Sequence, residues 1–272
     1  MSKTTLPPDQ NSTMERIPFG KSVQAEELFQ YTQMQELHRM LKLALQERAI
    51  LFVSGEAGVG KTTAVGAFAE QLPTNKYQVI YLGQDQEGTS LWRRLACSLG
   101  LKPSLSRAHT RLSVSQYLID NLIEKGKDVL LIVDEAHLLD NATLEDIRLL
   151  TNSDFDRVSP VSVILLGQLP LRGRLKTPGF EALNQRLRYR YSLEGYGEEE
   201  TGEYIRHRLQ AAGCSKELFS ADAIKALFFA AQGIPREINN LALAAILRAQ
   251  AESIEKIDAK LMKKVIDQRD LS

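Results

Sequence analysis

Short apolar runs alternate with amphipathic stretches along the chain up to Leu193. Runs of strand length predict strands at residues 50–54, 78–82, 129–133, 161–166 and 189–193. The third and fourth runs are apolar at nearly every position, as expected of strands buried on both faces of a parallel sheet. Between the second and third runs, apolar residues at helical spacing predict a helix with one apolar face, formed by Leu112, Tyr117, Leu118, Ile119, Leu122 and Ile123. This alternation predicts right-handed βαβ units and a doubly wound α/β sheet.

The pattern changes after Glu194, where Gly195 and Gly197 flank Tyr196 and strand-like runs stop. Helical patterns follow at residues 198–212, 221–232, 236–252 and 259–268, with Ser220 and Asp258 as expected N-caps and Gly213 and Gly233 as expected helix stops. We therefore expect a core at residues 17–195 and a small helical lid at residues 196–272. Residues 1–16 are polar and contain two prolines, which predicts a flexible tail and no signal peptide.

Composition limits the classes of function. Lys plus Arg and Asp plus Glu both number 34, so the formal net charge of the 272 residues is zero. A chain-wide basic field is absent, and any contact with nucleic acid has to come from a local patch. The two cysteines, Cys97 and Cys214, indicate a reducing compartment without a disulfide framework. Because the apolar runs are too short to cross a membrane, we expect a soluble, cytoplasmic protein.

Residues 55–62 fit the spacing G-x-x-x-x-G-K-[ST] between a predicted strand and a predicted helix. Glycines at these positions permit a tight loop whose amides converge on phosphates. The cation of Lys61 faces the β- and γ-phosphates, the hydroxyl of Thr62 ligates Mg²⁺, and the helix directs its positive dipole end at the same anion. The motif predicts a phosphate site made of Gly55, Glu56, Ala57, Gly58, Val59, Gly60, Lys61, Thr62 and Thr63, which binds ATP with Mg²⁺.

The strand at residues 129–133 ends in two adjacent carboxylates, Asp134 and Glu135. Asp134 is expected to hold Mg²⁺ through its water shell. Glu135 is expected to orient and polarise the attacking water as a general base. The alternative is a simple turn that begins with Asp-Glu after a strand. Together with the phosphate loop upstream, the pair predicts an ATP hydrolase, and His137 is expected to be only a loop residue.

Three more residues are candidates for sensing the nucleotide. Gln168 follows the fourth strand, and we expect it near the γ-phosphate and the water; a turn residue is the alternative. Arg186 is expected to reach the γ-phosphate of a neighbouring subunit and stabilise transition-state charge, with Arg188 and Arg190 as rivals and a solvated strand edge as the alternative. Arg236 follows Gly-Ile-Pro at the start of a helix and is expected to reach the nucleotide phosphates from the lid.

In this order, GEAGVGKTT, LLIVDEAH, LLGQ, LNQR and GIPREIN resemble the AAA+ ATPases of the ExeA, TnsC and MuB-like group, over residues 14–268. The resemblance implies a parallel 5-1-4-3-2 sheet flanked by helices and a C-terminal helical lid. ATP would then lie between the lid and a neighbouring subunit. It also implies that residues 18–31 hold the adenine.

The resemblance also implies partners. Secretion-type members of the group usually carry a membrane span and a wall-binding domain, and we expect neither here. Short cytosolic members resemble target-selection ATPases of transposons, which form a ring or helical filament on duplex DNA with ATP and recruit a separate transposase. The alternatives are a nucleotide switch that acts on a protein partner without DNA and a cytosolic ATPase of a secretion system.

Two basic clusters are candidates for contact with DNA. Lys102, Arg107 and Arg111 are the expected contacts in a longer stretch that also contains Arg93, Arg94, Lys125 and Lys127. A second cluster is formed by Arg172, Arg174 and Lys176. Both clusters would approach backbone phosphates without reading sequence. Ordinary solvated helix faces are the alternative. Trp92 is expected in the core.

Overall fold

The computed structural model describes residues 18–20, 27–83, 90–124, 126–152 and 159–269. The chain divides into two compact units. A core unit contains residues 32–57 and 61–193, and a helical unit contains residues 194–272 together with residues 1–31 and 58–60. The expected tail at residues 1–16 lies outside the described residues. Among the helices that are described, none has the length and apolar character needed to span a membrane.

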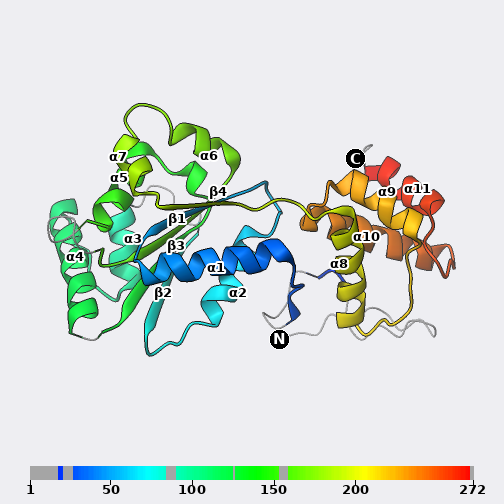
Figure 1. The fold of residues 1–272 in the computed structure, drawn as a ribbon, viewed down its shortest axis with the longest axis horizontal. Coiled ribbons are helices and arrows are strands. Elements are labelled where there is room, and N and C mark those ends of the chain that lie inside the picture. The colour runs from blue at the N-terminus through cyan, green and yellow to red at the C-terminus, as the bar shows by residue number, and fades with distance from the viewer. Residues whose placement is uncertain (1–17, 21–26, 84–89, 125, 153–158, 270–272) are drawn as a thin grey trace. The chain divides into compact units, whose positions relative to one another are not determined.

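The core unit is built on a parallel sheet of five strands in the order β2-β3-β4-β1-β5 (Figure 1). Each strand coincides with a predicted run to within one residue at either end: β1 (Ile50–Ser54), β2 (Tyr77–Leu82), β3 (Asp128–Val133), β4 (Ser162–Gly167) and β5 (Tyr189–Ser192). The order is the expected 5-1-4-3-2 order counted from the opposite edge. The expected α/β class and sheet topology are therefore confirmed.

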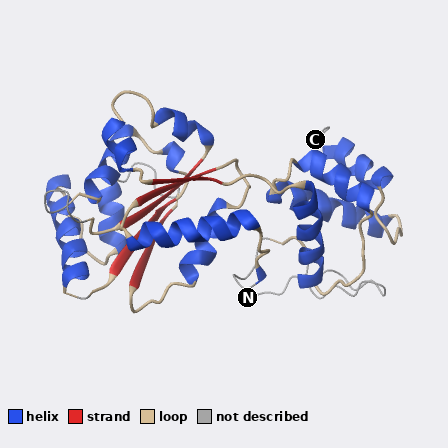
Figure 2. Cartoon of the chain, in the orientation of Figure 1, coloured by secondary structure: helices blue, strands red, loops and turns tan. Residues whose placement is uncertain are grey.

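Helices cover both faces of the sheet, which explains why the central strands are apolar throughout (Figure 2). Every residue of β1 and β4 is buried. Side chains such as Phe52 and Leu165 face a core shared with α3 (Leu91–Ser98), α4 (Arg107–Ile123), α5 (Asn141–Leu150), α6 (Leu169–Arg174) and α7 (Glu181–Arg186). The helices α1 (Thr32–Gln46) and α2 (Lys61–Glu70) pack on the other face. Burial of each large aliphatic side chain contributes about 1.5–3 kcal/mol.

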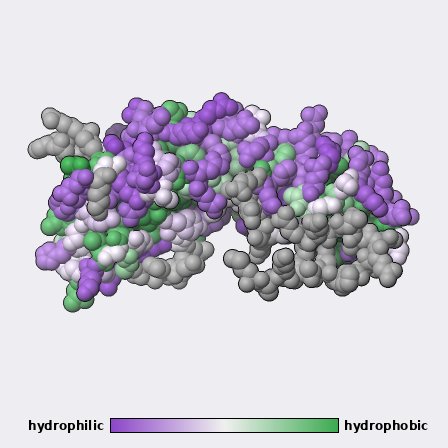
Figure 3. Space-filling model, turned by 90° about the horizontal axis from the view of Figure 1, so that it is seen from below, coloured by the Kyte–Doolittle hydropathy of each residue, from purple (hydrophilic) through white to green (hydrophobic). Residues whose placement is uncertain are grey.

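The expected apolar face of α4 is wrong in part. Leu112 and Ile123 are 67% and 75% exposed, and the buried positions of this helix are Thr110, Val114, Leu118 and Asn121. Residues two apart on an α-helix point to nearly opposite sides, so Leu112 cannot share the buried face of Val114. Exposed apolar residues also occur elsewhere, and on the face drawn in Figure 3 hydrophobic surface forms separate patches among hydrophilic surface.

Trp92 is 1% exposed, so its expected place in the core is confirmed.

The helical unit contains α8 (Glu198–Ala211), α9 (Ala221–Ala231), α10 (Pro235–Ala251) and α11 (Ala259–Arg269). Both expected N-caps are confirmed: the hydroxyl of Ser220 accepts from the Ala223 N–H at 3.2 Å, and Asp258 Oδ1 accepts from the Leu261 N–H at 2.8 Å. The unit has its own core, because Leu227, Ile238, Ala242 and Met262 are fully buried. Packing of these side chains stabilises the four helices against one another without a contribution from the sheet.

Candidate functional site

The sheet topology gathers the predicted site residues of the core unit at one edge. Ligands of open parallel sheets bind outside the carboxyl ends of the strands. At this edge β1 leads into the loop at residues 55–60, β3 leads into Asp134, and β4 leads into Gln168. Because β4 pairs with both β1 and β3, Gln168 follows a strand that lies between the other two. Its side chain is half-buried and makes no capping hydrogen bond to α6.

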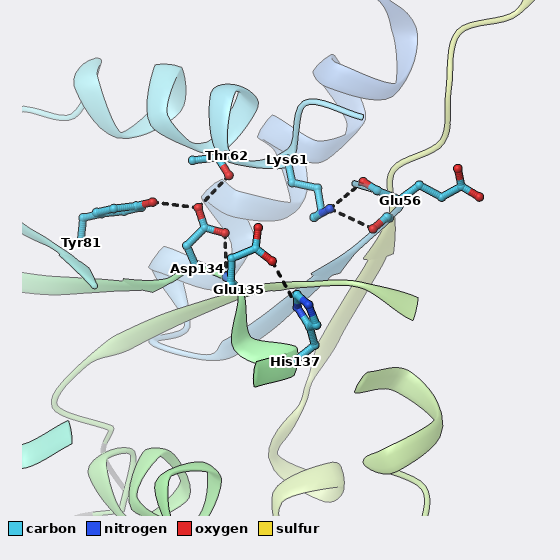
Figure 4. A network of polar contacts seen from close by, with 8 residues as sticks. Glu56, Lys61, Thr62, Tyr81, Asp134, Glu135 and His137 are labelled. Carbon is cyan, nitrogen blue, oxygen red and sulfur yellow. Dashed lines mark hydrogen bonds and ion pairs between the residues drawn. The ribbon is translucent and has the colours of Figure 1, made fainter. Parts of the chain in front are cut away.

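The lysine of the glycine-rich loop is folded back onto the loop itself (Figure 4). Lys61 Nζ donates to the carbonyl oxygens of Gly55 and Glu56, both at 2.8 Å, and the residue is only 8% exposed. Gly58 and Gly60 have φ angles of 84° and 99°, a region that residues with a Cβ rarely adopt. Glycine is therefore required at these two positions by their positive φ angles. The loop also holds the ammonium group of Lys61 close to its own carbonyls.

Asp134 accepts three hydrogen bonds although it is buried. Its Oδ2 accepts from Thr62 Oγ1 at 2.7 Å and from the Tyr81 hydroxyl at 2.8 Å, and its Oδ1 accepts from the Glu135 N–H at 2.8 Å (Figure 4). A buried carboxylate requires such partners to offset its lost hydration. The two residues expected to hold Mg²⁺, Thr62 and Asp134, are therefore in direct contact.

This pair of oxygen donors fits Mg²⁺. Magnesium in nucleotide sites is held by one or two protein oxygens together with phosphate oxygens and water. Over the residues that the structure describes, His, Cys, Asp and Glu side chains form no group of three or more that could hold a metal.

Glu135 has a strained backbone. Its φ and ψ of 50° and 37° lie in the left-handed region, which costs a residue with a Cβ about 1–3 kcal/mol. Its side chain is 41% exposed, and Oε2 lies 3.3 Å from Nδ1 of His137 in η2 (Ala136–Leu138). His137, expected to be only a loop residue, thus touches the expected general base. The contact between His137 and Glu135 and the hydrogen bond from Tyr81 to Asp134 were not predicted from the sequence.

The three candidate arginines near β5 differ in their surroundings. Arg186 is the last residue of α7 and is half-buried. Arg188 pairs with Glu47, with 2.8 Å between Nε and Oε2. Arg190 Nη2 donates to the side-chain and backbone oxygens of Asn184 at 2.6 and 2.9 Å. Arg188 and Arg190 hold these partners within the chain, and Arg186 is not without a partner either.

Of the basic residues expected to contact DNA, some have partners within the protein and others are exposed. Arg107 Nη2 lies 2.6 Å from Asp146 Oδ2, and the Arg111 guanidinium lies 5.6 Å from the centre of the Trp92 ring. Lys102 is exposed, and Lys125 lies outside the described residues. Two of the three favoured cations are thus partly satisfied by the protein itself.

In the helical unit, the segment expected to hold adenine belongs to an aromatic cluster. Residues 21–26 lie outside the described part, but Phe29 and Tyr31 stack with ring centres 5.9 Å apart and contact Tyr196. Burial and nearby Glu200 raise the pKa of Tyr31 to about 12, so the hydroxyl stays neutral. Arg236 is the second residue of α10 and is exposed. Tyr196 was noted in the sequence only as part of a break in the pattern.

Two comparisons of the sequence with known proteins gave matches. Residues 43–175 match the family described as AAA domain. The chain is 32% identical over 244 residues to General secretion pathway protein A of Aeromonas hydrophila, which covers 88% of this chain and 44% of that protein. The chain therefore spans less than half the length of this curated relative.

Solved structures of other proteins share the fold. The ORC2 protein of Aeropyrum pernix has a TM-score of 0.67 at 15% identity, covering 92% of this chain and 70% of that one. Drosophila ORC bound to DNA has a TM-score of 0.64 at 17% identity, covering 100% and 70%. The RuvB branch migration motor of Thermotoga maritima has a TM-score of 0.53 at 17% identity, covering 86% and 68%. Residues 43–175 thus match the AAA domain family, the chain resembles General secretion pathway protein A in sequence over 244 residues, and it shares the fold of the ORC and RuvB structures.

Proposed function

We propose that this chain binds ATP with Mg²⁺ and hydrolyses it at the carboxyl edge of the sheet. The observation that carries the proposal is the hydrogen bond of 2.7 Å between Thr62 and Asp134, which joins the start of α2, directly after the phosphate loop, to the residue that follows β3 and precedes Glu135. Lys61 exchanges the carbonyls of Gly55 and Glu56 for phosphate oxygens. When bound, Mg²⁺ neutralises developing charge on the phosphates. Glu135 accepts the proton of the attacking water.

Two substitutions test this assignment. Lys61→Ala removes the phosphate-facing cation of the loop, so tight ATP binding should be lost. Glu135→Gln keeps Asp134 and Thr62 in place, so ATP should bind and persist without hydrolysis. Filter binding of labelled ATP and release of phosphate measure the two effects. Unchanged turnover in Glu135→Gln excludes Glu135 as the base, and unchanged affinity in Lys61→Ala excludes Lys61 from the site.

We also propose what the ATPase cycle does: ATP-bound subunits assemble on duplex DNA and recruit or regulate a transposase. Support comes from the resemblance of the motifs to the transposon ATPases and from exposed cations on the core unit. A structure described as ORC bound to DNA shares this fold, which supports a role on DNA. Stimulation of ATP hydrolysis by duplex DNA tests the proposal, and a rate of hydrolysis that is the same with and without DNA contradicts it.

A second candidate function is favoured by a different observation. The 32% identity to General secretion pathway protein A supports an ATPase or nucleotide switch that acts on a protein partner. In that case hydrolysis is independent of DNA and responds to the partner alone. The same DNA-stimulation assay therefore separates the two candidates.

A further inference from the structure

A cavity lined by three cations lies in the core unit, and one of the three, Arg190, is also a rival of Arg186. We name it the cationic pocket; its volume is about 220 Å³, and it is lined by Phe52, Arg172, Leu175, Lys176, Asn184 and Arg190. All six residues belong to the core unit. No role in ATP binding or hydrolysis proposed above involves Arg172 or Lys176.

The elements of the core unit place these charged side chains around an apolar base. Arg172 and Lys176 are one helical turn apart, on α6 and the turn that follows it. Arg190 of β5 is paired in register with Phe52 of β1, so both side chains emerge on the same face of the sheet. Phe52 and Leu175 are 1% and 2% exposed and form the apolar base.

The pocket has cations and no carboxylate among its lining residues. Within the described ranges, Arg172, Lys176 and Arg190 form no ion pair. Arg174 lies between the first two in sequence but turns elsewhere, because its Nη1 donates to the Leu139 carbonyl at 2.7 Å. Three like charges over an apolar floor repel one another, and a bound anion removes this repulsion.

Size and geometry select the anion. Pockets that bind cofactors and drug-sized ligands measure about 300–1,000 Å³, so this cavity is too small for a whole nucleotide and large enough for one phosphate group. Arginine matches phosphate with paired N–H donors, and lysine adds a point charge. Arg190 is already oriented by Asn184, which reduces the cost of ordering it.

We propose that the cationic pocket seats one phosphate group, supplied by the backbone of duplex DNA in the assembled protein. This inference rests on the proposed function on DNA. It moves the main contact away from Arg107, whose charge is paired with Asp146, and from Arg111, which lies over the Trp92 ring. A free phosphate ion offers the same chemistry, so the experiment has to separate the two sources.

The test compares Arg172→Ala/Lys176→Ala with wild type and with a matched control, Lys225→Ala/Lys260→Ala, which removes two exposed lysines of the helical unit. Fluorescence anisotropy with a duplex and an ATP analogue is followed between about 50 and 200 mM salt. The pocket variant should lose about tenfold or more in affinity and show a shallower dependence on salt, with ATP affinity unchanged. The control should stay near wild type.

A second arm uses inorganic phosphate and calorimetry, in a Lys61→Ala background that removes binding at the phosphate loop. If adding Arg172→Ala/Lys176→Ala abolishes phosphate binding, the cationic pocket is supported as the phosphate site. If phosphate still binds with unchanged affinity, the proposal is overturned. Equal DNA affinity in the pocket variant and wild type, or an equal loss in the control, overturns the pocket while the proposed DNA function stands. If wild type binds no DNA in any nucleotide state, the proposed DNA function and the DNA source of the phosphate fall together.

Discussion

At the scale of single residues, Oδ2 of Asp134 accepts from two hydroxyls at once. A carboxylate oxygen has two lone pairs, and here Thr62 and Tyr81 occupy both. Thr62 is expected to turn to Mg²⁺ when nucleotide binds. Tyr81 then remains as the side chain that fixes the direction of the carboxylate. A hydrogen bond to a charged group contributes more than a neutral one, about 1.5–3 kcal/mol.

Tyr81→Phe should therefore lower the free energy of unfolding by about 1–2 kcal/mol, because the residue is 53% exposed and water replaces part of the bond. Tyr77→Phe on the same strand is the control and should change stability by less than about 0.5 kcal/mol. Urea denaturation measures both. A double-mutant cycle with Asp134→Asn should show coupling between residues 81 and 134, and additive effects of the two changes contradict the assignment.

The N-cap of α5 gives a dependence on pH. Asp140 Oδ1 accepts from the Thr143 N–H at 2.7 Å, and hydrogen bonds from Thr143 hold the pKa of this carboxyl below its ordinary value of 3.8. A folded-state pKa below the unfolded one means that the stabilisation is present above about pH 4 and is lost as the pH falls through the folded pKa. Asp140→Ala should cost about 1 kcal/mol at neutral pH and less at acid pH.

Guanidinium denaturation at neutral and acid pH checks this prediction. Asp140→Asn keeps an acceptor without a titrating charge, so its stability relative to Asp140→Ala should not change with pH. A cost of Asp140→Ala that is the same at both pH values shows that the cap does not act through its charge.

The contacts of single residues explain what the sequence could reveal of the site. Lys61, Thr62 and Asp134 stand in local motifs, so their types and spacing were enough to nominate them. The contact of Tyr81 with Asp134 could not be predicted in this way. It exists because β2 pairs with β3 in a register that places Tyr81 opposite Ile132, two residues before Asp134. A pairing register is a long-range property that no local spacing encodes. The chemical roles of all these residues stay predictions.

At the scale of elements, strands were easier to predict than helix faces. A strand buried on both faces reads as a continuous apolar run, and each such run is a strand. In α4 the buried face includes Thr110 and Asn121, whose side chains bond the carbonyls of Ser104 and Lys127. Polar residues with local partners can be buried at little cost. The spacing of apolar residues alone therefore predicted the buried face of α4 incorrectly.

Two substitutions on α4 test the corrected face. Leu118 is 2% exposed, so Leu118→Ala should lower the free energy of unfolding by about 2–5 kcal/mol through lost transfer energy and the cavity left behind. Leu112 is 67% exposed, and Leu112→Ala should change stability by less than about 0.5 kcal/mol. Thermal or urea denaturation measures both, and comparable effects at the two positions contradict the corrected face.

At the scale of the whole molecule, neither the fold nor the net charge identifies the partner. One fold serves many functions, and structures described as ORC bound to DNA and as a branch migration motor share it with this chain. With 34 basic and 34 acidic residues, a single subunit has no general attraction to DNA. If the chain functions on DNA, we therefore expect binding to depend on assembly, in which several subunits repeat the same contacts.

Arg186→Ala examines assembly through hydrolysis. If Arg186 acts on the nucleotide of a neighbour, its loss should leave nucleotide affinity of the monomer intact and lower turnover in the assembled state, by up to about 10³-fold or more as for other arginine fingers. Turnover is measured as a function of protein concentration. Lys225→Ala, which removes an exposed cation of the helical unit, is the control. Full activity of Arg186→Ala at saturating protein moves the assignment to Arg188 or Arg190.

DNA binding should occur only in the ATP-bound, oligomeric state and with little preference for sequence. One neutral subunit offers few phosphate contacts, and their sum is weak at physiological salt. A ring or filament repeats the same contacts along the duplex, and effective concentration multiplies them. Anisotropy with ATP analogue, ADP and no nucleotide, each at several salt concentrations, measures the effect. Binding should fall steeply with salt because it depends on counterion release. Equal binding in all three states, or none in any, leaves the protein-partner function as the better account.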